Sequence, residues 1–141
     1  MRYNFDMDGT IADLYGINDW CNRLQREDAT PYAEARPLVN MARLARALNR
    51  AQRNGHEIAV ISWTSRNCSA DYSHAIARAK REWLARHLPS VHWDAVAIIP
   101  YGTPKSHFGT GVLFDDEEQN RTEWGEGAYP PSEIFTALAR G

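Results

Sequence analysis

Short apolar runs alternate with longer stretches of helical periodicity along this chain. The runs cover residues 2–6, 57–62, 95–99 and 111–115. Each has the length and the β-branched or aromatic content of a strand. Apolar residues recur at helical spacing over 37–54 and 69–88, and a last helix is expected over 132–140. Strands that alternate with helices predict an α/β fold, in which a parallel sheet carries helices on both faces.

The length of the chain limits how this fold can be divided. With 141 residues, the sequence suits a single domain over 1–141. The window 13–37, between the first strand and the first long helix, is too short for a separate domain that would cover a substrate. We therefore expect this window to form a small helical flap, which acts at most as a rudimentary cap.

Charge and composition narrow the possible partners. A net charge of -2 gives no overall attraction to nucleic acid or to an anionic membrane, so nucleic acid is a possible but not a favoured partner. The sequence has no long apolar run and no leader-like start, and its two cysteines are too few for a disulfide framework. We expect a soluble, cytoplasmic protein with reduced thiols and no membrane partner.

The first predicted strand ends in two carboxylates, Asp6 and Asp8, and Gly9 follows them directly. Residues two apart on an extended strand point to the same side, so both carboxylates can address one point in space. Two like charges at that range need a cation or a shared proton, and a hard divalent ion such as Mg²⁺ prefers oxygen ligands. A turn with solvated carboxylates is the simpler alternative.

Residues that could contact a substrate also lie at or just past the ends of the other predicted strands. They are Ser62, Trp63, Thr64 and Ser65 at the second strand, Lys105 after the third, and Asp115 and Asp116 at the fourth. The carboxyl ends of parallel strands meet at one edge of a sheet, where open α/β folds bind ligands. Taken alone, a loop lysine is usually an exposed surface residue, and the acidic pair could merely cap the segment that follows it. Their common position instead predicts one shared site.

These motifs resemble the signatures of the haloacid dehalogenase superfamily of phosphohydrolases. The run Phe5 to Thr10 is similar to the first signature, Asp-x-Asp-Gly-Thr, and the other three follow in the family's order over about residues 2–120. The resemblance implies a Rossmann-like core and a Mg²⁺-dependent phosphatase with an aspartyl-phosphate intermediate. Thr64 with Ser65, and the step from Lys105 to Asp115, look most like the 5'(3')-deoxyribonucleotidase branch.

Under this resemblance the carboxylates have separate tasks. Asp6 would attack phosphorus as the nucleophile. Asp8 would protonate the leaving oxygen and then activate the water that hydrolyses the intermediate. Asp6 and the backbone carbonyl of Asp8 would bind the metal. Adjacent strand residues point to opposite sides, so only one of the acidic pair can ligate directly unless the strand has ended. The resemblance implies that Asp116 is the direct ligand and that Asp115 supports it from behind.

The remaining site residues would bind the phosphoryl group. Lys105 would neutralise both Asp6 and the transferring group. A hydroxyl at the end of the second strand would bond a phosphoryl oxygen, and we place Ser62 before Thr64 in that role. The other expected substrate contacts are Gly9, Thr10, Trp63, Thr64 and Ser65.

A nucleotide or related small phosphate is the leading substrate class. Tyr15, Trp20, Tyr32 and Trp63 can stack on a base, although they can equally pack the flap on the body. An open site also suits a bulky phosphoester, or a small one covered by a neighbouring subunit of a homo-oligomer.

Two alternatives stay open. A phosphatase acting on nucleic-acid ends would use the basic stripe Arg43, Arg46, Arg50 and Arg53, which is otherwise the solvated face of its helix. A catalytically idle domain that only binds a partner is the other alternative, because function lives in sites and not in folds.

Overall fold

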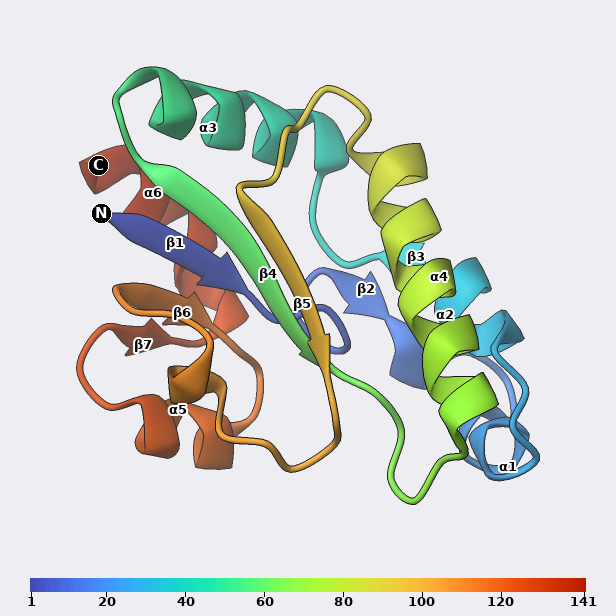
Figure 1. Cartoon of the computed structure of the whole chain (residues 1–141). Helices are drawn as coiled ribbons and strands as arrows, with labels where there is room; N and C mark the ends of the chain where they lie inside the picture. The colour runs from blue at the N-terminus through green and yellow to red at the C-terminus, as the bar shows by residue number, and fades with distance from the viewer.

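The computed structural model describes residues 1–141 and is built on a five-stranded parallel sheet (Figure 1). Its strands are β1 (Arg2–Phe5), β4 (Glu57–Trp63), β5 (Ala95–Ile99), β6 (Val112–Phe114) and β7 (Ala128–Tyr129). They lie in the order β5-β4-β1-β6-β7, and every neighbouring pair is parallel. β1 therefore occupies the middle of the sheet.

Helices cover both faces of this sheet, as predicted. On one face lie α3 (Met41–Arg53), the second half of α4 (Ala70–His87) and α6 (Ile134–Arg140), which share one apolar core with the sheet. The 3-10 turn η2 (Lys105–His107) and α5 (Glu118–Trp124) contact each other on the opposite face, beside β6 and β7. The α/β class and the Rossmann-like parallel sheet are thus confirmed.

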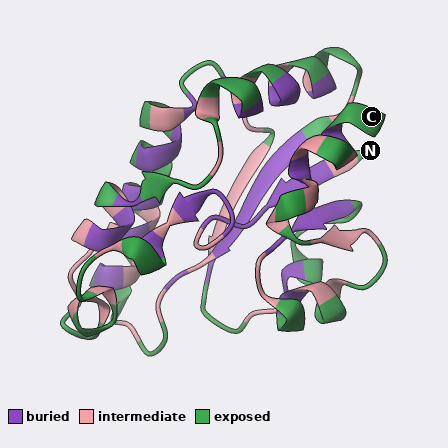
Figure 2. Cartoon of the chain, turned by 180° about the vertical axis from the view of Figure 1, so that it is seen from behind, coloured by how far each residue is buried: buried purple, intermediate pink, exposed green.

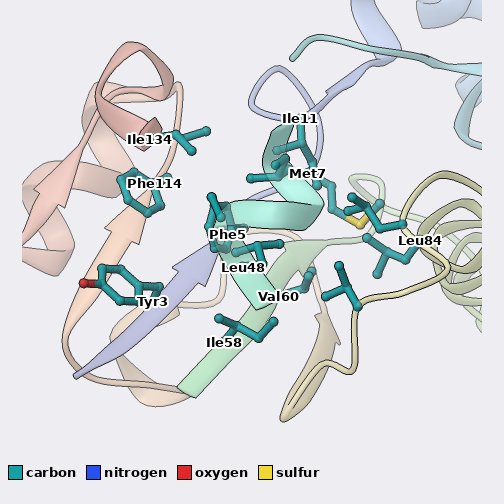
Figure 3. Close-up of a cluster of buried hydrophobic side chains, with 14 of the residues drawn as sticks. Tyr3, Phe5, Met7, Ile11, Leu48, Ile58, Val60, Leu84, Phe114 and Ile134 are labelled. Carbon is teal, nitrogen blue, oxygen red and sulfur yellow. The ribbon is translucent and has the colours of Figure 1, made fainter. Parts of the chain in front are cut away.

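The core is made by alternate residues of the three central strands. Phe5, Val60 and Phe114 point to the same face and share one buried core with Leu48 of α3 and Leu84 of α4 (Figure 3). The rings of Phe5 and Phe114 are 4.9 Å apart. Complete burial of one such side chain is worth about 1.5–3 kcal/mol. Figure 2 shows the result, with the central strands buried and the outer sides of the helices exposed.

Capping residues explain where the helices begin. α4 starts as expected, because the Ser69 hydroxyl accepts a hydrogen bond from the backbone N–H of Tyr72. The expected start of the preceding helix near Pro37 is wrong. Asn40 caps α3 by accepting from the N–H of Arg43, and Pro37 instead pairs with Ala12 in a short antiparallel ribbon. The last predicted helix divides into a 3-10 turn η3 (Pro131–Glu133) and α6.

The flap, residues 13–37, is ordered and helical. Within it lie η1 (Leu14–Gly16), α1 (Trp20–Gln25) and α2 (Thr30–Glu34), and its two ends belong to the ribbon of β2 (Ala12–Asp13) and β3 (Arg36–Pro37). Tyr72 of α4 donates to the carbonyl of Asp28, and Glu27 accepts from Ser69. The flap is therefore tied to α4, beside the ends of β1 and β4 (Figure 1). No helix of the chain has the length and apolarity needed to cross a bilayer.

Candidate active site

A cavity of about 740 Å³ opens where the carboxyl ends of β1, β4 and β5 meet the flap. Its polar lining is drawn from Asp6, Asp8, Gln25, Thr64, Ser65, Arg66, Asn67, Asp115, Glu117 and Asn120. Its apolar and aromatic lining comes largely from the flap, together with the last residue of β4 and the loop after β5. The cavity thus lies at the edge of the sheet that the sequence predicts for a site.

A buried ammonium joins the first and the fourth predicted motifs. Lys105 Nζ donates to Asp6 Oδ1 at 2.8 Å and to Asp115 Oδ2 at 2.6 Å. Only 2% of Lys105 is exposed. Burial alone lowers a lysine pKa, but the charges of the two carboxylates outweigh it and raise the pKa of Lys105 to about 12. This side chain therefore stays positively charged beside Asp6.

Three carboxylates gather at this point. Oxygens of Asp6, Asp115 and Asp116 lie within 4.8 Å of one another. Burial, followed by the charge of Asp6, raises the pKa of both Asp115 and Asp116. Lys105 supplies only one positive charge for three carboxylates. A divalent cation would neutralise the remaining negative charge. Oxygen ligands of this kind suit Mg²⁺ or a similar hard cation.

The two adjacent acids have different surroundings. Asp115 is fully buried, and its oxygens accept from Lys105, from Asn120 Nδ2 at 3.1 Å and from the N–H of Glu117 at 3.0 Å. Asp116 instead directs its Oδ2 toward Gly9, where a Cβ atom would lie only 2.3 Å from that oxygen. The Asp116 carboxylate also accepts from the Thr10 hydroxyl, at 3.2 Å from Oδ1. It is still the freer of the two carboxylates, and its role as the direct metal ligand stays a prediction.

Thr10 sits behind the acidic cluster. Its hydroxyl donates to Asp6 Oδ2 at 2.9 Å and accepts from the N–H of Asp116 at 3.1 Å. Gly9, directly before Thr10, turns the chain with a φ of 81°. Neither residue lines the cavity, although both are predicted as substrate contacts. In the structure they shape the loop that places Asp6 and Asp116.

Asp8 points elsewhere and meets a residue that the sequence analysis missed. Lys80 of α4 donates to Asp8 Oδ2 at 2.8 Å, to Ser62 Oγ at 2.7 Å and to the Trp63 carbonyl at 2.7 Å. Burial raises the pKa of Asp8, although Lys80 opposes the shift. A signal was present, because Lys80 lies four residues after Ile76 and therefore on the apolar stripe of its helix.

The hydroxyls at the end of β4 and just beyond it have two different surroundings. Ser62 is completely buried and accepts from Lys80, so its side chain does not reach the cavity. Thr64 and Ser65 do line the cavity, and Ser65 Oγ lies 2.5 Å from the hydroxyl of Tyr32. Of the two hydroxyls considered for the phosphoryl group, only that of Thr64 belongs to a residue on the cavity wall.

Two aromatic pairs contribute to the same wall. Tyr15 and Trp20 of the flap form an edge-to-face pair with ring centroids 4.9 Å apart. Trp63, the last residue of β4, and Tyr101, in the loop after β5, have ring centroids 4.8 Å apart, and Trp63 Nε1 donates to the Thr103 carbonyl. These side chains both close the cavity and present rings to it, so the two roles considered from the sequence do not exclude each other.

Comparison with solved structures finds similar folds. The chain aligns with one in the structure of a Pnkp1/Rnl/Hen1 complex at 16% identity and a TM-score of 0.57, covering 92% of this chain and 44% of that one. It also aligns with the D,D-heptose 1,7-bisphosphate phosphatase from Burkholderia thailandensis at 15% identity and a TM-score of 0.54, covering 99% of this chain and 84% of that one.

At these identities the two likenesses establish the fold alone. The chain spans less than half of the matched chain in the first structure, so more than half of that chain has no counterpart here. No protein-family model matches the sequence, and no curated protein matches it significantly. The chemistry must therefore be argued from the cavity and its residues.

Proposed function

We propose that this chain is a Mg²⁺-dependent phosphomonoesterase of the haloacid dehalogenase superfamily, with Asp6 as the nucleophile. The observation that carries the proposal is the position of Lys105. Its ammonium lies between Asp6 and Asp115, and Asp116 completes the acidic cluster at the end of the central strand. One fixed cation beside a ring of carboxylates suits a reaction that neutralises and positions a phosphoryl group.

The proposed reaction has two halves. An oxygen of Asp6 bonds to phosphorus while the bond to the leaving oxygen breaks, and Asp8 gives that oxygen a proton. The resulting aspartyl-phosphate is then hydrolysed by a water molecule whose proton passes to Asp8. Inorganic phosphate leaves, and both carboxyl groups return to their starting states. Asp6 and Asp8 both line the cavity, as these steps require.

The acidic cluster would hold the metal. Asp6 and Asp116 supply carboxylate oxygens, and Asp115 supports them through its bond to Lys105. When bound, Mg²⁺ would offset the negative charge of the phosphoryl group. Gly9 keeps the space beside Asp116 Oδ2 open, because any larger side chain would enter it.

The lining of the cavity supports a small phosphate with a planar group as substrate, of which a nucleotide is the leading case. Its size, about 740 Å³, falls within the range of small-molecule sites. Aromatic rings from the flap, from the end of β4 and from the loop after β5 offer stacking surfaces. Thr64 is the residue we propose to bond the phosphoryl oxygen, since Ser62 is occupied by Lys80.

Removal of the metal is expected to stop turnover. With an aryl phosphate as substrate, activity should require Mg²⁺ and disappear in EDTA. Asp116→Asn should lower kcat/KM by about 10²-fold or more, because it removes the freer carboxylate of the cluster. Mg²⁺ should also raise the melting temperature of the unaltered protein and leave that of the variant nearly unchanged.

The matched control for this variant is Glu57→Gln. Glu57 is an exposed acid at the start of β4, at the opposite end of the strand from the cluster. It should keep both the activity and the Mg²⁺-dependent rise in melting temperature. A folded chain that binds Mg²⁺ but hydrolyses no phosphate ester would contradict the phosphatase and favour the idle binding domain.

A phosphatase for nucleic-acid ends is the second candidate. Arg43, Arg46, Arg50 and Arg53 are all exposed on α3, and none of them takes part in a salt bridge. Such a stripe can follow a phosphate backbone, in which case binding falls steeply as salt increases. Our leading proposal instead treats the stripe as a solvated surface.

A triple variant separates the two candidates. We expect Arg46→Gln, Arg50→Gln and Arg53→Gln together to leave kcat/KM unchanged for a mononucleotide and for a phosphate-ended oligonucleotide. Arg43 is kept because its guanidinium stacks on Phe135 at 3.9 Å. A selective rise in KM for the oligonucleotide, with a shallower salt dependence, would favour the second candidate.

A further inference from the structure

Lys80 is a fully buried charge without an evident structural need. It projects from α4, where Ile76, Ala79 and Trp83 are also buried, and none of its surface is exposed. Removing an ammonium from water costs several kcal/mol, which packed apolar residues would not incur. A charge retained in such a place calls for an explanation in the site that it touches.

The contacts of Lys80 fix its ammonium completely. A lysine has three N–H donors, and these match three acceptors: Asp8 Oδ2, Ser62 Oγ and the Trp63 carbonyl oxygen. Two of these acceptors belong to the end of β4, which is a rigid part of the sheet. The third belongs to the loop after β1. Lys80 therefore uses β4 as a support from which it holds Asp8.

Asp8 is also the carboxylate that lies outside the acidic cluster. The oxygens within 4.8 Å of one another come from Asp6, Asp115 and Asp116, and Asp8 contributes none of them. Asp8 lines the cavity, whereas Lys80 does not. With Oδ2 engaged by Lys80, the other oxygen of Asp8 is the one left to exchange a proton with a substrate.

We propose that Lys80 is a positioning residue, which holds the Asp8 carboxylate away from the acidic cluster and orients it toward the leaving group. This inference rests on the proposed phosphatase activity. Four carboxylates surround one site, and one of them must remain free of the cation if it is to transfer protons. Ser62 belongs to the same device, because it anchors the ammonium.

Leaving groups of different basicity test this role. A 4-nitrophenyl phosphate expels a stable phenolate and needs little help from an acid, whereas an alkyl phosphate such as a nucleoside 5′-monophosphate needs a proton. Lys80→Met should lower kcat/KM for the alkyl phosphate by about 10²-fold and that for the aryl phosphate by less than about tenfold. The ratio kcat/KM is the right quantity, because it includes only steps up to departure of the leaving group.

Asp8→Asn provides the reference pattern. It should show the same preference for the aryl phosphate. Adding Lys80→Met to it should cause little further loss, since Asp8→Asn removes the proton donor that Lys80 positions. Lys80→Arg should not restore activity toward the alkyl phosphate, because a planar guanidinium cannot reach three acceptors arranged around one nitrogen.

Two controls separate positioning from a loss of stability. Arg78→Met removes an exposed cation from the same helix and should leave kcat/KM unchanged for both substrates. Leu84→Ala makes a cavity in the core beneath α4 and should lower stability without altering the ratio of the two substrates. If Lys80→Met fails to fold, Ser62→Ala takes its place, because it removes one anchor of the ammonium and should give a smaller loss with the same preference.

The results distinguish this inference from the proposed function. If the unaltered protein hydrolyses both esters and Lys80→Met lowers kcat/KM equally for both, the positioning role is wrong and the phosphatase proposal stands. Equal losses in a folded Ser62→Ala would overturn it in the same way. If the unaltered protein hydrolyses neither ester, the proposed function and the role of Lys80 both fall.

Discussion

Replacing Asp6 with asparagine is expected to lower kcat for phosphate esters by on the order of 10⁴-fold or more. The substitution keeps the shape of the side chain but removes the oxygen that would bond to phosphorus. Asp6 directly follows the central strand and is only 6% exposed, so the rigid end of β1 fixes its position in the site. The rate of release of phosphate from an aryl ester, with saturating Mg²⁺, measures the loss.

Folding of the Asp6→Asn variant should be preserved. Asn can still accept from Lys105 or Thr10, and the substitution removes one of three mutually repelling carboxylates. Its melting temperature should therefore equal or exceed that of the unaltered chain in EDTA. Asp71→Asn, an exposed carboxylate on the first turn of α4, is the matched control and should keep full activity. A folded Asp6→Asn protein that retains a tenth of the activity would exclude Asp6 as the nucleophile.

Lys105→Met should have the largest effect on stability. The ammonium is the direct ion-pair partner of both Asp6 and Asp115, and its loss leaves two buried carboxylates facing each other. Breaking a buried ion pair in this way costs about 3–5 kcal/mol. A domain of this kind has only about 5–15 kcal/mol of stability in total. Urea unfolding in EDTA, followed by circular dichroism, measures the difference.

A second substitution checks the cause of that loss. Adding Asp115→Asn to Lys105→Met should recover part of the stability, since only one uncompensated carboxylate then remains beside the lost cation. Arg78→Met, which removes an exposed cation, should change the free energy of unfolding by less than about 0.5 kcal/mol. If Lys105→Met were as stable as Arg78→Met, the ion pairs of Lys105 would not hold the site together.

The strands and the common edge of the site could be predicted because they depend on local patterns. β5 matches its predicted range, and β1, β4 and β6 end within one residue of theirs. Parallel strands bring their carboxyl ends together, so Asp6, Lys105 and the acidic pair meet as expected. Their catalytic roles remain predictions, since adjacency alone does not establish chemistry.

Other features depend on contacts between distant segments. β7 has two residues and no periodicity of its own, and it forms because it pairs with β6. Our preference for Thr64 over Ser62 as the phosphoryl ligand rests on Lys80 of α4, which lies 18 residues beyond Ser62 in the chain. The start of α3 depended on whether Pro37 pairs with Ala12. Each outcome was set by a partner that local periodicity does not reveal.

The most direct test is to find the phosphoryl group on the chain during turnover. Asp8→Asn should slow hydrolysis of the intermediate, because Asp8 activates the attacking water. An aryl phosphate, which needs little proton donation, should still form it. After an acid quench, peptide mass spectrometry should then locate one phosphoryl group on Asp6. A folded, active chain that carries the phosphoryl group on another residue, or on none, would contradict the proposed mechanism.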